Sequence, residues 1–163
     1  MANVLDVAKF ICEYYKEISN EDIDELKLHK LLYFCQREHL AILNTPLFDE
    51  PLLGWRHGPV SKIVRDNFDR TLLVGDSSKI SNDDKTIIKN VVEQYGEFSS
   101  WKLRDLSHEE TSWKNSRVGL EPYQNGNKEL SIEDIREDAK KVRPFDSTWG
   151  MYYDEFDLIG ELV

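Results

Sequence analysis

Apolar side chains recur at helical spacing along several stretches of the chain, and this periodicity is the main structural signal in the sequence. The first stretch follows Asn3, a helix-capping residue, ends near Ser19-Asn20, and places on one stripe Val4, Val7, Ala8, Ile11, Tyr15 and Ile18. The second stretch covers residues 25–43 and carries at the same period Leu28, Leu31, Leu32, Cys35, His39 and Ile42. Because more than half of its circumference is apolar, we expect the second helix to be central.

Three further helices are predicted from serine caps followed by apolar stripes. Ser81 with Asp84 forms a capping pair, and the helix that follows is closed by Gly96. Ser99 or Ser100 caps a shorter helix that runs through Trp101, Leu103 and Leu106. Ser131 with Asp134 caps the last one, which carries Ile132, Ile135, Ala139 and Val142.

The segments between these helices contain turn and strand signals. Prolines and glycines alternate with large side chains over residues 47–60, which predicts an ordered loop with a short strand at residues 52–55. Pro59 suits the first position of a further helix, with inward side chains at Val60, Ile63, Val64 and Phe68. Residues 72–74 form either a short strand or a connection that touches the core, and Asn125-Gly126 is a hairpin signal.

The predicted fold class is therefore mainly α (α+β), with about six helices around a central helix and a few short strands or hairpins. Strand and helix patterns do not alternate, which argues against a doubly wound sheet with a nucleotide crevice. The length of 163 residues fits one domain. We assign residues 1–143 to that domain and residues 144–163 to an acidic, aromatic C-terminal extension.

The formal net charge of −10 narrows the range of partners. A chain this acidic repels phosphate backbones and anionic membranes unless its basic residues form a patch, and the sequence shows none. We therefore expect no direct nucleic-acid or membrane partner. Neither a signal peptide nor a membrane-spanning apolar run is recognisable, so we expect a cytoplasmic protein.

Motifs of catalysis and cofactor binding are missing from the sequence. It contains no GxGxxG or GxxxxGK loop, no HExxH, no GxSxG and no CxxC, so we expect a protein that is not an enzyme and has no cofactor. Cys12 and Cys35 are interpreted as buried free thiols. A remote alternative is a metal-dependent hydrolase built from His57, His108 and Glu109. The plainer interpretation makes His39 a core residue, His57 a loop anchor and His108 a helix-end residue that interacts with the helix dipole.

The sequence WRHGPV at residues 55–60 is the most unusual local segment. A tryptophan, an arginine and a histidine stand between two glycines, Gly54 and Gly58. Two interpretations remain open. Either Trp55 fills the core and the glycines only make turns, or part of the loop is a recognition surface.

These residues resemble the Panacea domain, the family of SocA-like antitoxins that includes phage-associated GepA-like proteins. The run KLHKLLYF at residues 27–34 resembles the family helix KLQKLLYF, with His29 in place of Gln, and Cys35 replaces the Ala that follows it. PLFDEP at residues 46–51 and WRHGPV at residues 55–60 resemble the family motifs PLFxE and WxxGPV.

The resemblance implies an antitoxin of a type II toxin-antitoxin system that neutralises a cognate protein toxin by direct protein-protein binding. The alternative is a proteolytic adaptor that delivers the toxin to an ATP-dependent protease. The acidic net charge suits a toxin with a basic surface, and a homodimer remains open. The candidate partner-binding residues are Trp55, Arg56, His57, Gly58, Pro59, Val60, Trp113, Trp149, Tyr152, Tyr153 and Phe156.

The last 20 residues hold half of the excess negative charge. Residues 144–163 contain five acidic side chains and no lysine or arginine. Their acidic and aromatic residues fit a segment that docks on a basic partner groove. They fit equally well a terminal element that packs Trp149, Tyr153 and Phe156 on the protein's own core.

Overall fold

The computed structural model describes residues 1–70 and 74–142. Over these residues the chain forms seven α-helices and one two-stranded antiparallel sheet. The elements are α1 (Val4–Ser19), α2 (Glu25–Leu43), β1 (Leu53–Trp55), β2 (Gly58–Val60), α3 (Lys62–Asp66), η1 (Phe68–Arg70), η2 (Ser77–Lys79), α5 (Asn82–Tyr95), α6 (Ser100–His108), α7 (Thr111–Ser116) and α8 (Ile132–Lys140). The expectation of a mainly helical protein with a small hairpin is confirmed.

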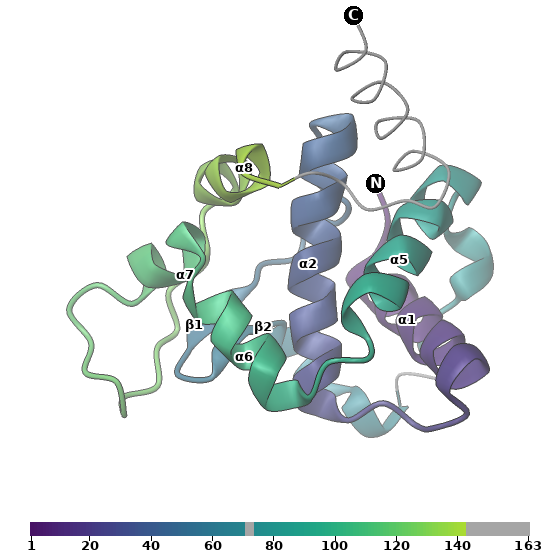
Figure 1. Ribbon diagram of the computed structural model, residues 1–163, viewed down its shortest axis with the longest axis horizontal. Coiled ribbons are helices and arrows are strands. Elements are labelled where there is room, and N and C mark those ends of the chain that lie inside the picture. Colours follow the sequence, from purple (N-terminus) through teal and green to yellow (C-terminus); the bar gives the residue numbers. More distant parts are fainter. Residues whose placement is uncertain (71–73, 143–163) are drawn as a thin grey trace, which may run out of the picture.

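Helix α2 runs through the middle of the molecule (Figure 1) and contacts α1, α5, α6, α8 and β2. Every residue from 27 to 40 is buried, polar side chains included. Several of the buried polar side chains are hydrogen-bonded, as the Gln36 amide illustrates: it donates to Phe48 O at 2.9 Å and accepts from Leu47 N at 2.7 Å. The prediction of a central helix is confirmed. The helix is buried more fully than its apolar pattern predicts, because its polar residues are buried as well.

The ends of the first two helices follow from their sequence. The Asn3 side chain accepts from Leu5 N to begin α1, and the Asp24 side chain accepts from Lys27 N to begin α2. Both helices end at an asparagine in the left-handed conformation, Asn20 with φ of 60° and Asn44 with φ of 59°. The predicted bounds of these two helices are therefore confirmed.

A buried polar cluster joins α2 to α7 and α8. The Tyr33 hydroxyl lies 3.1 Å from Asp138 Oδ2 and 3.2 Å from Ser112 Oγ. The Asp138 carboxylate also accepts from the backbone N–H groups of Thr111 at 2.8 Å and Ser112 at 2.9 Å. Helix α7 therefore takes its N-terminal cap from α8, since its own N-cap residue, Glu110, makes no capping hydrogen bond.

The hairpin lies at a different place from the one predicted. Strand β1 confirms the predicted short strand, but the residue proposed to start a helix, Pro59, lies in β2, opposite Gly54. Gly54 N donates to Lys128 O at 2.9 Å, and Gly54 O accepts from Arg117 Nη1 at 3.1 Å. Both groups point away from β2, so the missing N–H of Pro59 costs no hydrogen bond between the strands. Helix α3 begins only after Ser61, whose side chain caps it.

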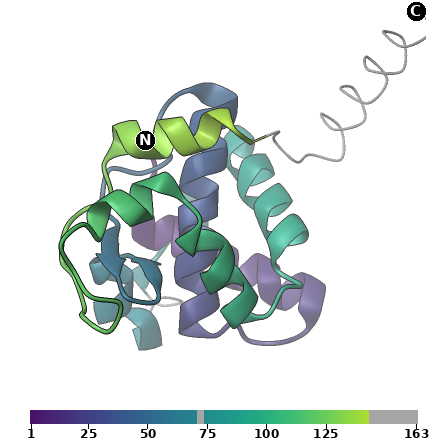
Figure 2. The same ribbon diagram turned by 60° about the vertical axis from the view of Figure 1, so that its left-hand side comes forward.

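The Asn125-Gly126 hairpin prediction is wrong. These residues belong to the loop of residues 117–131, which passes around the outer side of the β1–β2 hairpin (Figure 2) and is joined to β1 through Leu52, Gly54 and Lys128. Two side chains assigned to inward faces are exposed, Ile18 by 48% and Ile63 by 37%. Residues 72 and 73 and the extension of residues 144–163 lie outside the described residues.

Candidate functional site

The turn of the hairpin, Arg56-His57, is held from three sides. Trp113 Nε1 on α7 donates to Trp55 O at 2.8 Å. Arg56 N donates to Asn125 Oδ1 at 3.3 Å, and Arg104 Nε on α6 donates to His57 Nδ1 at 3.1 Å. The turn is therefore fixed by α6, α7 and the loop of residues 117–131, as a recognition loop on a rigid scaffold would be.

The rest of the WRHGPV segment lies inside the protein and supports this turn. Gly58, Pro59 and Val60 are buried, and Lys30 Nζ donates to Pro59 O at 3.1 Å. Gly58 has φ of 112°, a conformation that side-chain-bearing residues rarely adopt. These three residues shape the hairpin, while Trp55, Arg56 and His57 reach its surface.

Trp113 is a half-buried support beneath the hairpin. Its ring stacks on the His108 ring with centroids 3.8 Å apart and planes inclined by 9°. Burial, with a smaller contribution from Arg104, lowers the pKa of His108 to about 4. His108 is the last residue of α6, as expected of a helix-end residue, and a neutral imidazole makes no cationic interaction with the helix dipole.

Trp101 places an exposed aromatic ring beside the turn. Its centroid lies 5.5 Å from the His57 ring in an edge-to-face arrangement, and the Arg104 guanidinium lies 5.5 Å from its centroid. We name Trp55, Arg56, His57, Trp101 and Arg104 the hairpin face. Exposed aromatic and arginine side chains held on a fixed scaffold are the make-up of an interaction hot spot.

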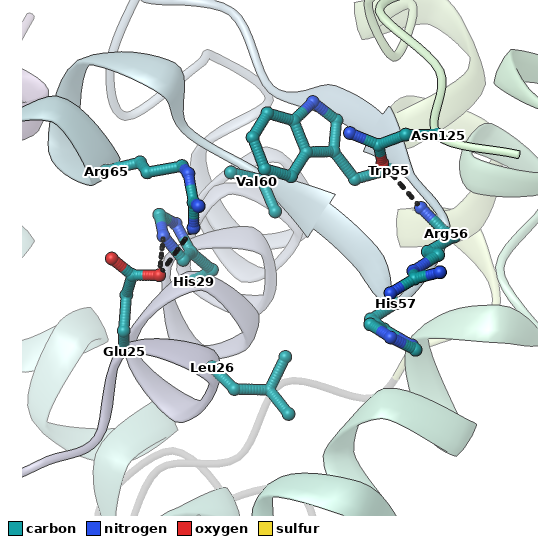
Figure 3. Close-up of a pocket in the computed structure, with 9 residues that line it drawn as sticks. All are labelled: Glu25, Leu26, His29, Trp55, Arg56, His57, Val60, Arg65 and Asn125. Carbon is teal, nitrogen blue, oxygen red and sulfur yellow. Dashed lines mark hydrogen bonds and ion pairs between the residues drawn. The ribbon is translucent and has the colours of Figure 1, made fainter.

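A cavity of about 500 Å³ adjoins the hairpin face (Figure 3). It lies between the start of α2, the hairpin and α3, and is lined by Glu25, Leu26, His29, Trp55, Arg56, His57, Val60, Arg65 and Asn125. One wall is braced by Arg65, whose guanidinium lies 4.9 Å from the Trp55 ring centroid and donates to Glu25 Oε2 at 2.9 Å. The cavity has a size typical of ligand sites.

His29 forms part of the inner end of this cavity. Only 2% of its surface is exposed, and Nδ1 accepts from Ser61 N at 3.2 Å. Burial, helped by the positive charges of Lys30 and Arg65, lowers the pKa of His29 to about 3. The ring is therefore neutral at physiological pH and carries its proton on Nε2.

The fold gathers arginines that the sequence scatters. Arg56 on the hairpin, Arg65 on α3 and Arg104 on α6 all lie around the cavity and the turn. Burial together with the charges of Arg56 and Arg104 lowers the pKa of His57. Two of these arginines are ion-paired, Arg65 with Glu25 and Arg104 with Asp105, so the local excess of positive charge is small.

The alternative of a metal-dependent hydrolase requires a metal site, and the described part of the chain contains none. There, no three side chains of His, Cys, Asp or Glu converge to hold an ion. His57 Nδ1 is engaged by Arg104, the His108 ring stacks on Trp113, and Glu109 is the C-cap residue of α6. Over residues 1–70 and 74–142, no helix is both long and apolar enough to span a membrane.

Both thiols are free, as expected, but Cys12 is half-buried and not buried as predicted. Cys35 is fully buried on α2, and burial raises its pKa well above the usual value. Burial, with a smaller effect of Glu13, raises the pKa of Cys12 to about 12. Both thiols are therefore protonated at neutral pH and poorly nucleophilic.

Some of the residues expected to bind a partner lie together in the structure, and others lie outside the described residues. Trp55, Arg56 and His57 share one surface. Trp149, Tyr152, Tyr153 and Phe156 lie outside the described residues. The sequence did not indicate that His29, Arg65, Trp101 and Arg104, which come from three different helices, would join the hairpin residues. One signal was available, because Trp101 and Leu103 are two residues apart and cannot share one face of a helix.

A helical domain that presents a fixed aromatic and cationic face has the features of a protein-binding domain. The chain belongs to the family described as antitoxin SocA-like, Panacea domain, whose family model matches residues 28–114. This match confirms the resemblance found in the sequence. No curated protein matches the chain, and no solved structure does.

Proposed function

We propose that this protein is the antitoxin of a type II toxin-antitoxin pair and neutralises a cognate toxin by direct binding. The observation that carries the proposal is the family match over residues 28–114, since the family is described as antitoxin SocA-like. All five residues of the hairpin face lie within the matched segment. The proposed action occludes the toxin and involves no catalytic step and no cofactor.

The hairpin face supplies the proposed contact surface. Trp101 offers a large exposed ring, and Arg56 and Arg104 offer cationic groups beside it. Tryptophan and arginine are the residues in which interface energy most often concentrates. Gly58, Pro59, Val60 and Trp113 contribute by holding this face in shape.

Co-expression with the product of the adjacent reading frame tests the proposal. We expect that product to arrest growth alone and the wild-type chain to relieve the arrest. Trp101→Ala should weaken the relief, whereas Ile18→Ala, which also removes an exposed apolar side chain but on α1, should leave it unchanged. Equal growth arrest with and without the wild-type chain would contradict the proposal.

The toxin's half-life, measured in the same cells, distinguishes occlusion from delivery to a protease. Occlusion leaves the half-life unchanged while growth recovers. A half-life that shortens in step with recovery would assign the chain to the proteolytic adaptors instead.

For residues 144–163 we propose a second, electrostatic contact with a basic region of the toxin. The support is their composition of five acidic side chains with no basic one. Removing these residues should weaken toxin binding, reduce its salt dependence and leave the melting temperature of the remaining chain unchanged. A large fall in melting temperature without a selective loss of binding would show that they pack on the protein's own core.

A further inference from the structure

The cavity beside the hairpin face contains a buried hydrogen-bond donor without an acceptor. Because His29 Nδ1 accepts from Ser61 N, the ring proton lies on Nε2. Nε2 is fully buried and has no hydrogen-bond partner. The nearest carboxylate oxygen, Glu25 Oε2, lies 3.9 Å away, which is beyond hydrogen-bonding distance (Figure 3). Unpaired buried donors are rare in folded proteins, so the His29 donor calls for an acceptor.

Charge around the cavity favours an anionic acceptor. Its lining holds two arginines, Arg56 and Arg65, and one acid, Glu25, so its formal charge is +1 in a chain of −10. Arg65 is already paired with Glu25. Among the described residues the Arg56 guanidinium has no ion pair or hydrogen bond, and its side chain is exposed at the rim.

The remaining lining combines three apolar side chains with His57 and Asn125. Leu26, Val60 and the Trp55 ring surround the space in front of His29 (Figure 3). A carboxylate on a short aliphatic stem, as in glutamate or aspartate, matches both the donors and this lining. The cavity shares Trp55, Arg56 and His57 with the hairpin face, so a protein seated on that face lies directly over its opening.

We propose that the cavity receives an acidic side chain of the partner protein, whose carboxylate accepts a hydrogen bond from His29 Nε2–H and is attracted by the positive charge of Arg56 at the rim. This inference rests on the proposed function, because the partner is the toxin. It adds a requirement that net charge alone does not predict: a toxin with a basic surface also presents one acidic residue opposite this cavity.

The test measures the affinity of the purified full-length chain for the purified product of the adjacent reading frame, by calorimetry. Arg56→Glu should weaken binding by about 10-fold or more, as expected for a charge pair at an interface. Lys140→Glu changes the charge equally at an exposed site on α8 and should alter the affinity by less than about 3-fold. Equal effects of the two variants would overturn the inference.

Two substitutions of His29 provide an independent measurement. Gln can still accept from Ser61 N and donate into the cavity, so His29→Gln should keep most of the affinity, whereas His29→Met should lose it. Equal affinity of both folded variants would show that the donor is not used, and would overturn the inference.

A charge-reversal scan identifies the acidic residue. Each aspartate and glutamate of the toxin is changed to lysine, and we expect one variant to restore binding to Arg56→Glu. A scan in which none restores it contradicts the inference. If N-acetylglutamate alone shifts the His29 Nε2–H resonance as fully as the toxin does, the cavity is a small-anion site and the inference fails. If wild-type protein does not bind the toxin at all, the proposed function itself fails.

Discussion

Replacing Gly58 by alanine tests the packing that holds the hairpin face in place. A Cβ at this position would lie 2.6 Å from Lys30 Cε and 2.6 Å from Ser107 Oγ. Both side chains are fully buried, so neither can move into solvent to make room. Gly58 also has φ of 112°, so alanine would be strained there even without a clash.

The two effects can be separated by magnitude. A left-handed backbone costs an L residue about 1–2 kcal/mol, partly offset by the lower entropy of the unfolded alanine chain, about 0.4–1 kcal/mol. Overpacking a filled interior costs about 1–3 kcal/mol more. We therefore expect Gly58→Ala to lower the free energy of unfolding by about 2–4 kcal/mol, a large share of the ~5–15 kcal/mol typical of a domain.

Gly119 provides the matched control. Its φ is 87°, and a Cβ built there meets no heavy atom within 4 Å. Gly119→Ala therefore carries the backbone cost alone, about 1 kcal/mol. Urea unfolding followed by far-ultraviolet circular dichroism measures both variants, and unchanged m-values would show that they unfold from comparably compact states.

A double-mutant cycle with Ser107→Ala examines the clash itself. Removing the Ser107 hydroxyl clears one of the two closest contacts, so Gly58→Ala should cost less in the Ser107→Ala background. The reasoning is refuted if Gly58→Ala costs no more than Gly119→Ala and Ser107→Ala relieves nothing.

Three further predictions concern buried groups. The lowered pKa of His29, about 3, gives stability that is present above the unfolded pKa and lost on acidification, so wild type should lose about 2 kcal/mol more than His29→Gln between about pH 8 and pH 5 in urea titrations; equal losses would contradict this. Tyr33→Phe removes one hydrogen-bond donor from Asp138 and should lower the free energy of unfolding by about 1–3 kcal/mol. An unchanged urea midpoint would show that the buried polar cluster does not stabilise the fold. A chromogenic disulfide reagent should label neither Cys12 nor Cys35 in native protein at neutral pH and both in urea; rapid labelling of the native protein would contradict the raised pKa of Cys12 and the burial of Cys35.

The sequence predicted those helices whose caps lie next to them in the chain. Asn3, Ser81 and Ser131 each bond to the first turn of the helix that follows, so a local pattern located α1, α5 and α8. Helix α7 was missed because its cap, Asp138, lies about 27 residues later on another helix. Its short, polar sequence carries no apolar stripe that would indicate it.

The hairpin shows how tertiary contacts override a turn signal. Asn125-Gly126 has the residues of a tight turn, but the residues after it pair with the β1 segment and not with the residues before it. Arg56-His57 has no typical turn sequence and is held by Trp113 and Arg104 from other helices. Such a turn depends on contacts between residues far apart in the chain, which local patterns do not contain.

For the candidate site, the sequence located the hairpin residues and missed what surrounds them. Trp55, Arg56 and His57 stand in one unusual segment and could be found there. His29 lies among apolar residues of α2, and Arg65 and Trp101 lie in ordinary helical segments. Only the folded chain places them beside the hairpin, so a local pattern in the sequence could not reveal them.

Because Asp138 on α8 caps α7, proteolysis from the C-terminal side affects the hairpin before it reaches the hairpin residues themselves. Asp138 holds the first turn of α7, and Trp113 on α7 holds Trp55 O at the hairpin. A protease that trims the chain from its C-terminal end would remove Asp138 long before it reached the family-matched segment. The hairpin would then lose its support while every residue of the hairpin face was still present, so limited digestion would abolish binding before it abolished helical structure.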